Sequence, residues 1–216
     1  MKILTRSSIS SLLWLCLLAF FTWLMARITV NYMPYHTDVG FLRIKQQYID
    51  IDHWRIAFFI HVYASMWVLL AGFTQFSSRL QRASPKWHRL LGYVYVVNIL
   101  LVTGPAGLLM GFYANGGFSS RLGFVLLAAL WIYFTFRAWR CSRTGDYAAH
   151  RRHMIRSYAL TLSAITLRIW KYVLTNLYHL DPSWVFPPMD VYRAVAWAGW
   201  GVNLLVAEWM IRRRTH

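Results

Sequence analysis

The chain has 216 residues, of which 58% are hydrophobic, 18% aromatic and only 14% charged. Soluble domains carry about a quarter charged residues, so this composition excludes a disordered chain and argues against a soluble enzyme. The formal net charge of +16 would suggest a nucleic-acid partner in a soluble protein. Here the basic residues lie between long apolar runs, so we expect them to orient the chain in a lipid bilayer, with no nucleic acid bound.

Six segments are long and apolar enough to cross a bilayer as helices, which takes about 20 residues. In chain order the expected spans are approximately residues 8–29, 54–76, 90–112, 122–140, 155–178 and 191–211. The first follows basic residues, as a signal peptide does, but its apolar run is longer than a signal core, so we expect an uncleaved anchor. The connections are too short for another domain. We therefore predict an all-α fold: a single membrane domain over residues 1–216, a polytopic integral membrane six-helix bundle.

The basic residues favour one orientation of these spans. If the chain starts inside the cell, most of its Lys and Arg residues fall on the cytoplasmic side. These residues are Lys2, Arg6, Arg79, Arg82, Lys86, Arg89, Arg137, Arg140, Arg143, Arg151, Arg152, Arg156, Arg212, Arg213 and Arg214. The positive-inside rule thus predicts an N-in/C-in, multi-pass protein of the bacterial cytoplasmic (inner) membrane. Glu208, four residues before Arg212, is expected to pair with it along the helix.

The third predicted span contains a proline and two glycines that bear on its shape. Pro105 removes a helical hydrogen bond, so we expect a kink near it. Gly107 and Gly111 form a GxxxG pair, which lets helices approach closely in lipid. The sequence shows no inverted repeat and no paired broken helices of the kind that transporters have.

Polar or small residues recur at steps of three or four through the fifth predicted span, which places them on one helix face. They are His150, His153, Ser157, Thr161, Ala164, Arg168, Tyr172 and Thr175. An Arg near mid-membrane costs at least a few kcal/mol in lipid, so we expect Arg168 to face the bundle and to mark a binding site. The alternative is that its side chain reaches the outer headgroups, roughly 15 Å away along the helix.

His61 lies in the outer half of the second span, at a depth similar to that of Arg168. A neutral imidazole beside a guanidinium suits a quinone carbonyl or a haem propionate, because Arg donates hydrogen bonds in a rigid fork. Gln75, on the same span, would extend this polar lining. Alternatively, each of these side chains makes only a hydrogen bond to a neighbouring helix.

Three histidines begin predicted spans on the cytoplasmic side: His88, His150 and His153. Axial ligation of haem iron takes a neutral imidazole from each of two elements. His88 with either His150 or His153 would provide that pair, and the surrounding arginines would neutralise the propionates. The same arginines argue against a bare divalent cation. The alternative is that these histidines are interfacial and contact anionic lipid headgroups.

Several motifs occur in order between the second and fifth spans. They read FIH at 59–61, GFTQF at 72–76, HRLLGYVY at 88–95, AHRRHMIRSYA at 149–159 and TLR at 166–168. With this set the chain resembles a family of predicted bacterial membrane proteins known as a domain of unknown function (number twenty-three-oh-six). The resemblance implies that the family's recurring polar residues fall on His61, Gln75, His88, His150 and Arg168. It favours His150 over His153, which stands where the family usually has Trp, and it implies no reaction.

The chain is also distantly similar to the multi-span b-type cytochromes, the cytochrome b561 and ferric reductase group. Those proteins hold haem between histidines of paired helices on both membrane sides. This chain has only one clearly intramembrane His in its outer half, His61, so we expect one haem at most.

The leading hypothesis is a redox protein of the inner membrane that binds one b-type haem or a quinone. His88 and His150 would ligate the iron, while His61, Gln75 and Arg168 would contact the cofactor. A membrane redox partner or the quinone pool would exchange electrons with it. Two alternatives are a non-redox carrier that binds a small anion at Arg168, and a scaffold or assembly partner of a membrane complex. Whether the protein is an enzyme stays open.

Overall fold

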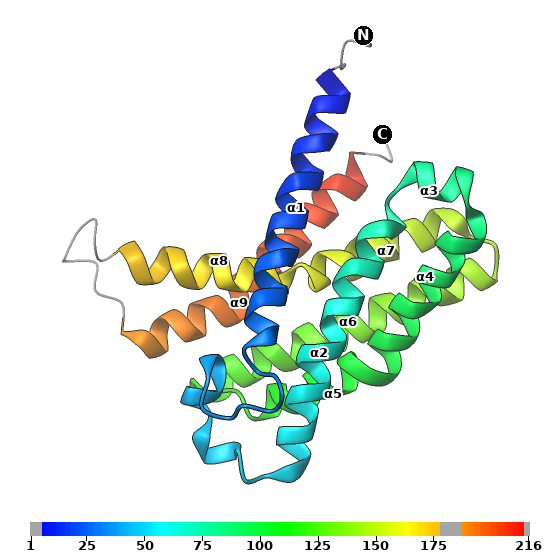
Figure 1. The fold of residues 1–216 in the computed structure, drawn as a ribbon. Helices are drawn as coiled ribbons and strands as arrows, with labels where there is room; N and C mark the ends of the chain where they lie inside the picture. The colour runs from blue at the N-terminus through cyan, green and yellow to red at the C-terminus, as the bar shows by residue number, and fades with distance from the viewer. Residues whose placement is uncertain (1–5, 178–186, 214–216) are drawn as a thin grey trace. The chain divides into compact units, whose positions relative to one another are not determined.

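The computed structural model describes residues 6–177 and 187–213, and every regular element within these ranges is a helix (Figure 1). The predicted all-α fold is thereby confirmed. Lys2, Arg214 and the end of the predicted fifth span at residue 178 lie outside the described residues. The chain divides into two compact units, residues 1–50 and 51–216, each with its own internal packing.

The first unit consists of one long helix and a compact turn region. Helix α1 spans Arg6–Val30, which matches the first predicted span, and the short helices η1 (Gly40–Ile44) and η2 (Gln46–Tyr48) follow it. The buried Tyr32 hydroxyl accepts a hydrogen bond of 3.0 Å from the Phe41 backbone N–H. A Cβ on Gly40, whose φ is +54°, would lie 2.7 Å from that hydroxyl. Only glycine therefore fits this turn.

The second unit contains eight α-helices and one π-helical turn in its described part. They are α2 (Asp52–Gln75), α3 (Ser78–Ala83), α4 (Pro85–Asn98), the π-turn η3 (Ile99–Thr103), α5 (Gly104–Phe112), α6 (Gly117–Arg143), α7 (Tyr147–Thr161), α8 (Ser163–Asn176) and α9 (Pro188–Arg212). Helix α2 packs on α4 and α5, α6 packs on α5 and α7, and α9 packs on α6, α7 and α8.

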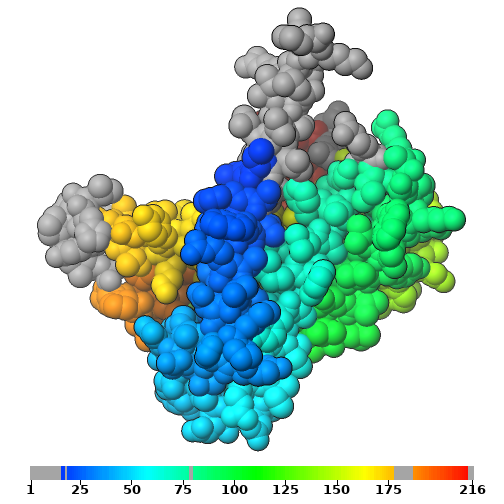
Figure 2. All heavy atoms as spheres, in the orientation of Figure 1, coloured from blue at the N-terminus to red at the C-terminus, as the bar shows by residue number. Residues whose placement is uncertain are grey.

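Four helices in the described ranges are long and apolar enough to cross a membrane. They cover Asp52–Gln75, Pro85–Phe112, Gly117–Arg143 and Pro188–Arg212. These four match the second, third, fourth and sixth predicted spans. Many of their apolar side chains face outward, as lipid-facing residues do: Leu90, Tyr93 and Val97 are exposed on α4, whose surface is visible in Figure 2.

The fifth predicted span is not one helix. Helix α7 ends at Thr161 and α8 begins at Ser163, with Leu162 between them. Hydroxyl side chains bond back to the carbonyl four residues earlier on both sides of this break: Thr161 Oγ1 to Ser157 O, and Thr166 Oγ1 to Leu162 O. Such bonds compete with the helical ladder and often bend helices. Neither half alone has the length of a spanning helix, so the expectation of one continuous fifth span is wrong.

The third predicted span is interrupted at the place that the proline indicates. The backbone widens into a π-turn over Ile99–Thr103, where the Gly104 N–H donates to the Ile99 carbonyl five residues earlier. Pro105 follows immediately and has no N–H to continue the regular ladder. A Cβ on Gly104 would collide with the Ile99 carbonyl oxygen and with the Ile132 side chain of α6. The structure thus has a π-turn directly before Pro105, where the sequence predicts a kink.

Candidate functional site

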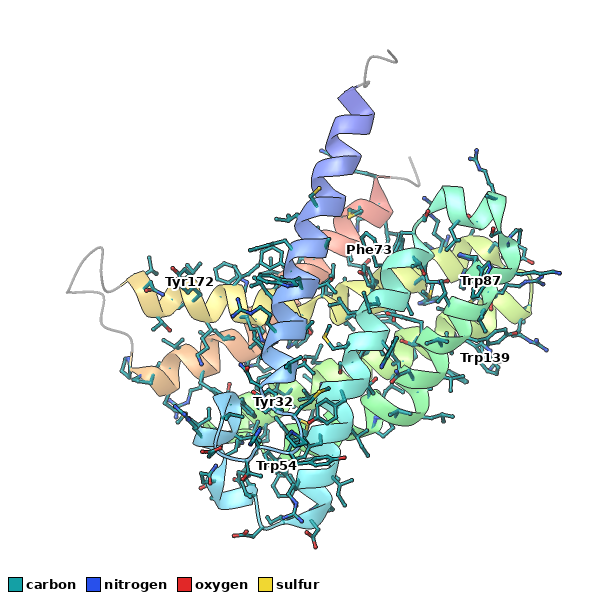
Figure 3. The ribbon with its side chains drawn as sticks, in the orientation of Figure 1. Tyr32, Trp54, Phe73, Trp87, Trp139 and Tyr172 are labelled. Atoms are coloured by element: carbon teal, nitrogen blue, oxygen red, sulfur yellow. The ribbon has the colours of Figure 1, made fainter. Side chains whose placement is uncertain are left out.

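One end of the second unit brings together the last turn of α2, the start of α4, the end of α6 and the start of α7 (Figure 1). Trp87 on α4 and Trp139 on α6 both lie there (Figure 3). Exposed basic side chains gather on these segments, and we call this region the basic end. They are Arg82, Lys86, Arg89, Arg137, Arg140, Arg143 and Arg151.

His150 is held by its own helix start and by the neighbouring helix. The Asp146 carboxylate caps α7 by accepting from the Ala149 N–H at 2.9 Å. His150 Nδ1 lies 2.8 Å from the Ala138 carbonyl oxygen of α6. A carbonyl only accepts, so Nδ1 carries the hydrogen and Nε2 of the neutral ring carries a lone pair. Nε2 has no partner in the described part of the chain, and metal-ligating histidines have this same arrangement.

His88 lies in the first turn of α4, close to His150. Each ring lies within electrostatic range of the other. The His88 backbone carbonyl accepts from Gln75 Nε2 at 3.3 Å. Its Nδ1 is buried and lacks a hydrogen-bond partner among the residues described. His88 and His150, the two histidines that the sequence predicts as a ligand pair, thus lie within electrostatic range of each other, and their role as ligands stays a prediction.

Gln75 joins two helices at the basic end. Its amide nitrogen donates to the His88 carbonyl and, at 3.4 Å, to Thr74 Oγ1. A Cβ on Gly92 of α4 would lie 3.0 Å from Gln75 Oε1, so the glycine leaves room for the amide. Gln75 therefore positions the His88 turn against the end of α2.

His153 lies one turn beyond His150 and has different surroundings. Its ring stacks on Phe134 of α6, with centroids 6.0 Å apart and an interplanar angle of 28°. Its Nδ1 is buried without a hydrogen-bond partner in the described ranges. Burial first, and then the positive charge of neighbouring arginines, chiefly Arg156, lower the pKa of His153 below its ordinary value.

Glu208 of α9 forms an ion pair with another helix. Its carboxylate forms a two-pronged ion pair with Arg156 of α7, with Nε–Oε1 at 2.5 Å and Nη2–Oε2 at 2.9 Å. Arg212, the partner expected within the same helix, lies within electrostatic range of the carboxylate, but the two-pronged contact is with Arg156. The fork of the guanidinium matches both carboxylate oxygens, and this geometry couples α7 to α9.

His61 lies in the half of α2 opposite to Gln75, nine residues after the helix begins. Its Nδ1 lies 3.0 Å from the Thr103 carbonyl oxygen, at the end of the π-turn. A Cβ on Gly107 would lie 2.9 Å from the His61 Cε1 atom, so the absence of a side chain there admits the ring. The end of the π-turn and Gly107, both in the third predicted span, thus hold the His61 imidazole.

Arg168 of α8 is exposed, and the expectation that it is enclosed in the bundle is wrong. Its Nη1 donates to the Ala164 carbonyl at 2.5 Å, and its charge lies within electrostatic range of His61. Ser157 and Thr161 of the predicted polar face are buried, whereas Arg168, beyond the interruption at Leu162, is exposed. Tyr172, on the same side of the interruption as Arg168, is exposed as well (Figure 3).

A buried hydroxyl network joins α4, α6 and α7, and the sequence reasoning missed its centre, Tyr95. The Tyr95 hydroxyl lies 2.8 Å from both Ser157 Oγ and Thr161 Oγ1. Trp131 Nε1 donates to Thr161 Oγ1 at 3.0 Å, and Thr135 Oγ1 lies 2.7 Å from Ser157 Oγ. The signal was the spacing: Tyr95 follows His88 by seven residues and Ser157 follows His150 by seven, so each pair shares a helix face.

No group of three or more His, Cys, Asp or Glu side chains that could hold a metal ion occurs among residues 6–177 and 187–213.

A family model described as a predicted membrane protein (DUF2306) matches residues 58–211. The match extends from α2 into α9 and includes His61, Gln75, His88, His150 and Arg168. No curated protein and no solved structure matches the chain. On the strength of a match over more than half its length, the chain belongs to the DUF2306 family of predicted membrane proteins.

Proposed function

We propose that this membrane protein is a redox protein that holds one b-type haem between His88 and His150. The observation that supports this is the hydrogen bond between His150 Nδ1 and the Ala138 carbonyl, which fixes the tautomer of a ring that lies within electrostatic range of His88. An axial ligand needs a lone pair on a neutral imidazole, and the bond to the Ala138 carbonyl leaves that lone pair on His150 Nε2. Neither ring nitrogen of His88 has a partner in the described residues.

The chain's own residues would orient and neutralise such a group. The Ala138 carbonyl holds the His150 ring, and Gln75 holds the turn that carries His88. Haem propionates would meet the exposed cations of the basic end, such as Arg89 and Arg151, which lie beside the two histidines in the sequence. When bound, haem would supply one-electron transfer to a membrane redox partner or the quinone pool.

We also propose the membrane placement that this function needs. The positive-inside rule puts the basic end on the cytoplasmic side of a bacterial inner membrane. Helix α1 and the interrupted pair α7–α8 would then be the first and fifth of six crossings, with both chain ends inside. Fusing a reporter that is active on only one side of the membrane after Thr144 and, separately, after Gly116 tests this placement.

A reduced-minus-oxidised spectrum of the full chain, expressed with a haem supply and purified in mild detergent, tests the haem proposal. We expect a b-type spectrum, with at least about tenfold less haem per chain in His88→Ala and His150→Ala. His153→Gln is the matched control and should keep the haem. His150→Gly with added imidazole should regain the spectrum if the loss reflects a missing ligand. A wild-type protein without haem bands, or an unchanged spectrum in His150→Ala, would overturn the proposal.

A second candidate is a carrier for a small anion at Arg168, and two helix interruptions favour it. The regular α-helix is interrupted by the π-turn at Ile99–Thr103 and again at Leu162. Interrupted helices line substrate sites in many transporters. The carrier predicts a water path to Arg168. Single cysteines at Ala164 and Thr175, in a chain whose Cys16 and Cys141 are replaced, would then react with a membrane-impermeant thiol reagent, and lack of reaction excludes the path.

A further inference from the structure

We propose that His61, assisted by the charge of Arg168, is the binding point for a quinol, the reduced form of a membrane quinone. The proposal deepens the redox function proposed above and rests on it. It names the substrate class, a membrane quinone, and the redox form that the resting protein binds, the quinol.

The first step is how the backbone holds the His61 imidazole. The Thr103 carbonyl lies at the end of the π-turn, and its oxygen is 3.0 Å from His61 Nδ1. Gly107 leaves room for the ring edge, because any Cβ there would lie 2.9 Å from Cε1 and 3.1 Å from Nδ1. Single π-turns inside helices occur frequently at functional sites. The imidazole is thus held on one edge by backbone alone.

The second step is the chemistry of the other edge. The Thr103 carbonyl only accepts, so Nδ1 carries the hydrogen, and Nε2 of the neutral ring carries a lone pair. No described residue bonds to Nε2, and the His61 side chain is partly exposed. Nε2 of the neutral His61 ring therefore accepts a hydrogen bond, for example from an O–H group. A hydroquinone hydroxyl provides that hydrogen, whereas the carbonyl of the oxidised ring does not.

The third step is the setting. His61 lies inside one of the helices that can cross the membrane, so a lipid-soluble ligand can reach it from the bilayer. The Arg168 guanidinium is exposed on α8, a helix that packs on α9 and α7 and hardly meets α2, yet its positive charge reaches the His61 ring. This charge favours an electron-rich oxygen beside the imidazole. A quinol has an apolar ring, a hydroxyl hydrogen to donate and an electron-rich hydroxyl oxygen in one molecule.

The site is separate from the histidine pair. His61 and Gln75, which bonds to the His88 turn, are fourteen residues apart on α2, or about 21 Å along the helix. Substitution at His61 can therefore change quinol binding without removing a haem ligand.

The test is equilibrium binding of decylubiquinol to the purified full chain under argon, with bound quinol counted after gel filtration. We expect about one quinol per chain, and binding about tenfold weaker in His61→Ala, because one hydrogen bond is lost. Gly107→Ala keeps the imidazole but displaces it and should weaken binding as well. Lys171→Gln, which removes a cation three residues from Arg168, is the matched control and should bind normally. Decylubiquinone should bind more weakly than the quinol.

The outcomes separate this inference from the haem proposal, because haem is measured with dithionite in the same samples. Quinol binding that depends on His61 in a chain without haem would support the site and refute the haem. Haem with no quinol binding, or with binding unchanged in both His61→Ala and Gly107→Ala, would overturn the inference alone. Displacement of the quinol by equimolar oleic acid would also overturn it, because the site would then take any lipid with an acidic hydroxyl.

Discussion

The Tyr95 hydroxyl of α4 lies 2.8 Å from the Ser157 hydroxyl of α7, in a completely buried part of the bundle. This contact joins two helices that carry the proposed ligand histidines, each seven residues earlier in its own helix. The network around it therefore sets how the start of α4 sits relative to the start of α7.

Replacing Tyr95 by Phe should destabilise the bundle. The substitution removes two hydrogen bonds and leaves the Ser157 and Thr161 hydroxyls short of a partner, which costs about 1–3 kcal/mol in the free energy of unfolding. Unfolding titrations in detergent would measure the loss. Tyr93→Phe, at an exposed position on the same helix, is the control and should change stability by less than about 0.5 kcal/mol. Equal stability of the two variants would contradict a structural role for the network.

Replacing Gly72 by Ala should force α2 away from its neighbours. The added Cβ would lie 2.6 Å from a Tyr95 ring carbon and 2.7 Å from the Tyr158 ring, and both rings are buried. Overpacking of this kind costs about 1–3 kcal/mol. Gly201→Ala in α9, where the new methyl group meets nothing within 4 Å, should instead be neutral or stabilising by up to about 1 kcal/mol. Thermal unfolding of both variants distinguishes packing from helix propensity.

The Arg156–Glu208 pair should contribute modestly to stability. Both side chains are partly exposed, so solvent screens the two-pronged contact and we expect a coupling of at most about 1 kcal/mol. A double-mutant cycle with Arg156→Gln and Glu208→Gln measures it, and high salt should reduce it. A coupling that is absent at low salt would show that this ion pair does not help to hold α7 against α9.

His153 should make stability depend on pH. Its pKa is lower in the folded chain than in the unfolded one, so below about pH 6.5 the unfolded state binds more protons. The contribution is therefore complete above the ordinary pKa and is lost as the pH falls below it. His153→Phe, which retains a ring against Phe134, should reduce the drop in Tm between about pH 8 and about pH 5.5. An unchanged drop would mean that other groups control the acid sensitivity.

The sequence predicted the apolar helices correctly because lipid satisfies no backbone hydrogen bonds, and a spanning segment has to make its bonds locally. Local information also indicated the disturbance before Pro105 and the inward face of Ser157 and Thr161. It grouped His88 with His150 as well, through their equivalent positions at the starts of two spans.

Other features depend on contacts between residues far apart in the chain. Glu208 pairs with a residue 52 positions away, and no local pattern ranks Arg156 above Arg212. Arg168 is exposed, whereas Ser157 and Thr161 of the same predicted stripe are buried, and the helix is interrupted between them at Leu162, which periodicity does not foresee.

By itself the sequence determined the class of protein, its family motifs and most of its apolar helices, because these follow from hydrophobicity and spacing within single segments. Only the tertiary structure decided which nitrogen of His61 and of His150 carries the hydrogen. The position of that hydrogen depends on a backbone carbonyl of another helix. Which carbonyl lies beside the ring is decided by how the two helices pack, and neither helix sequence determines this packing by itself.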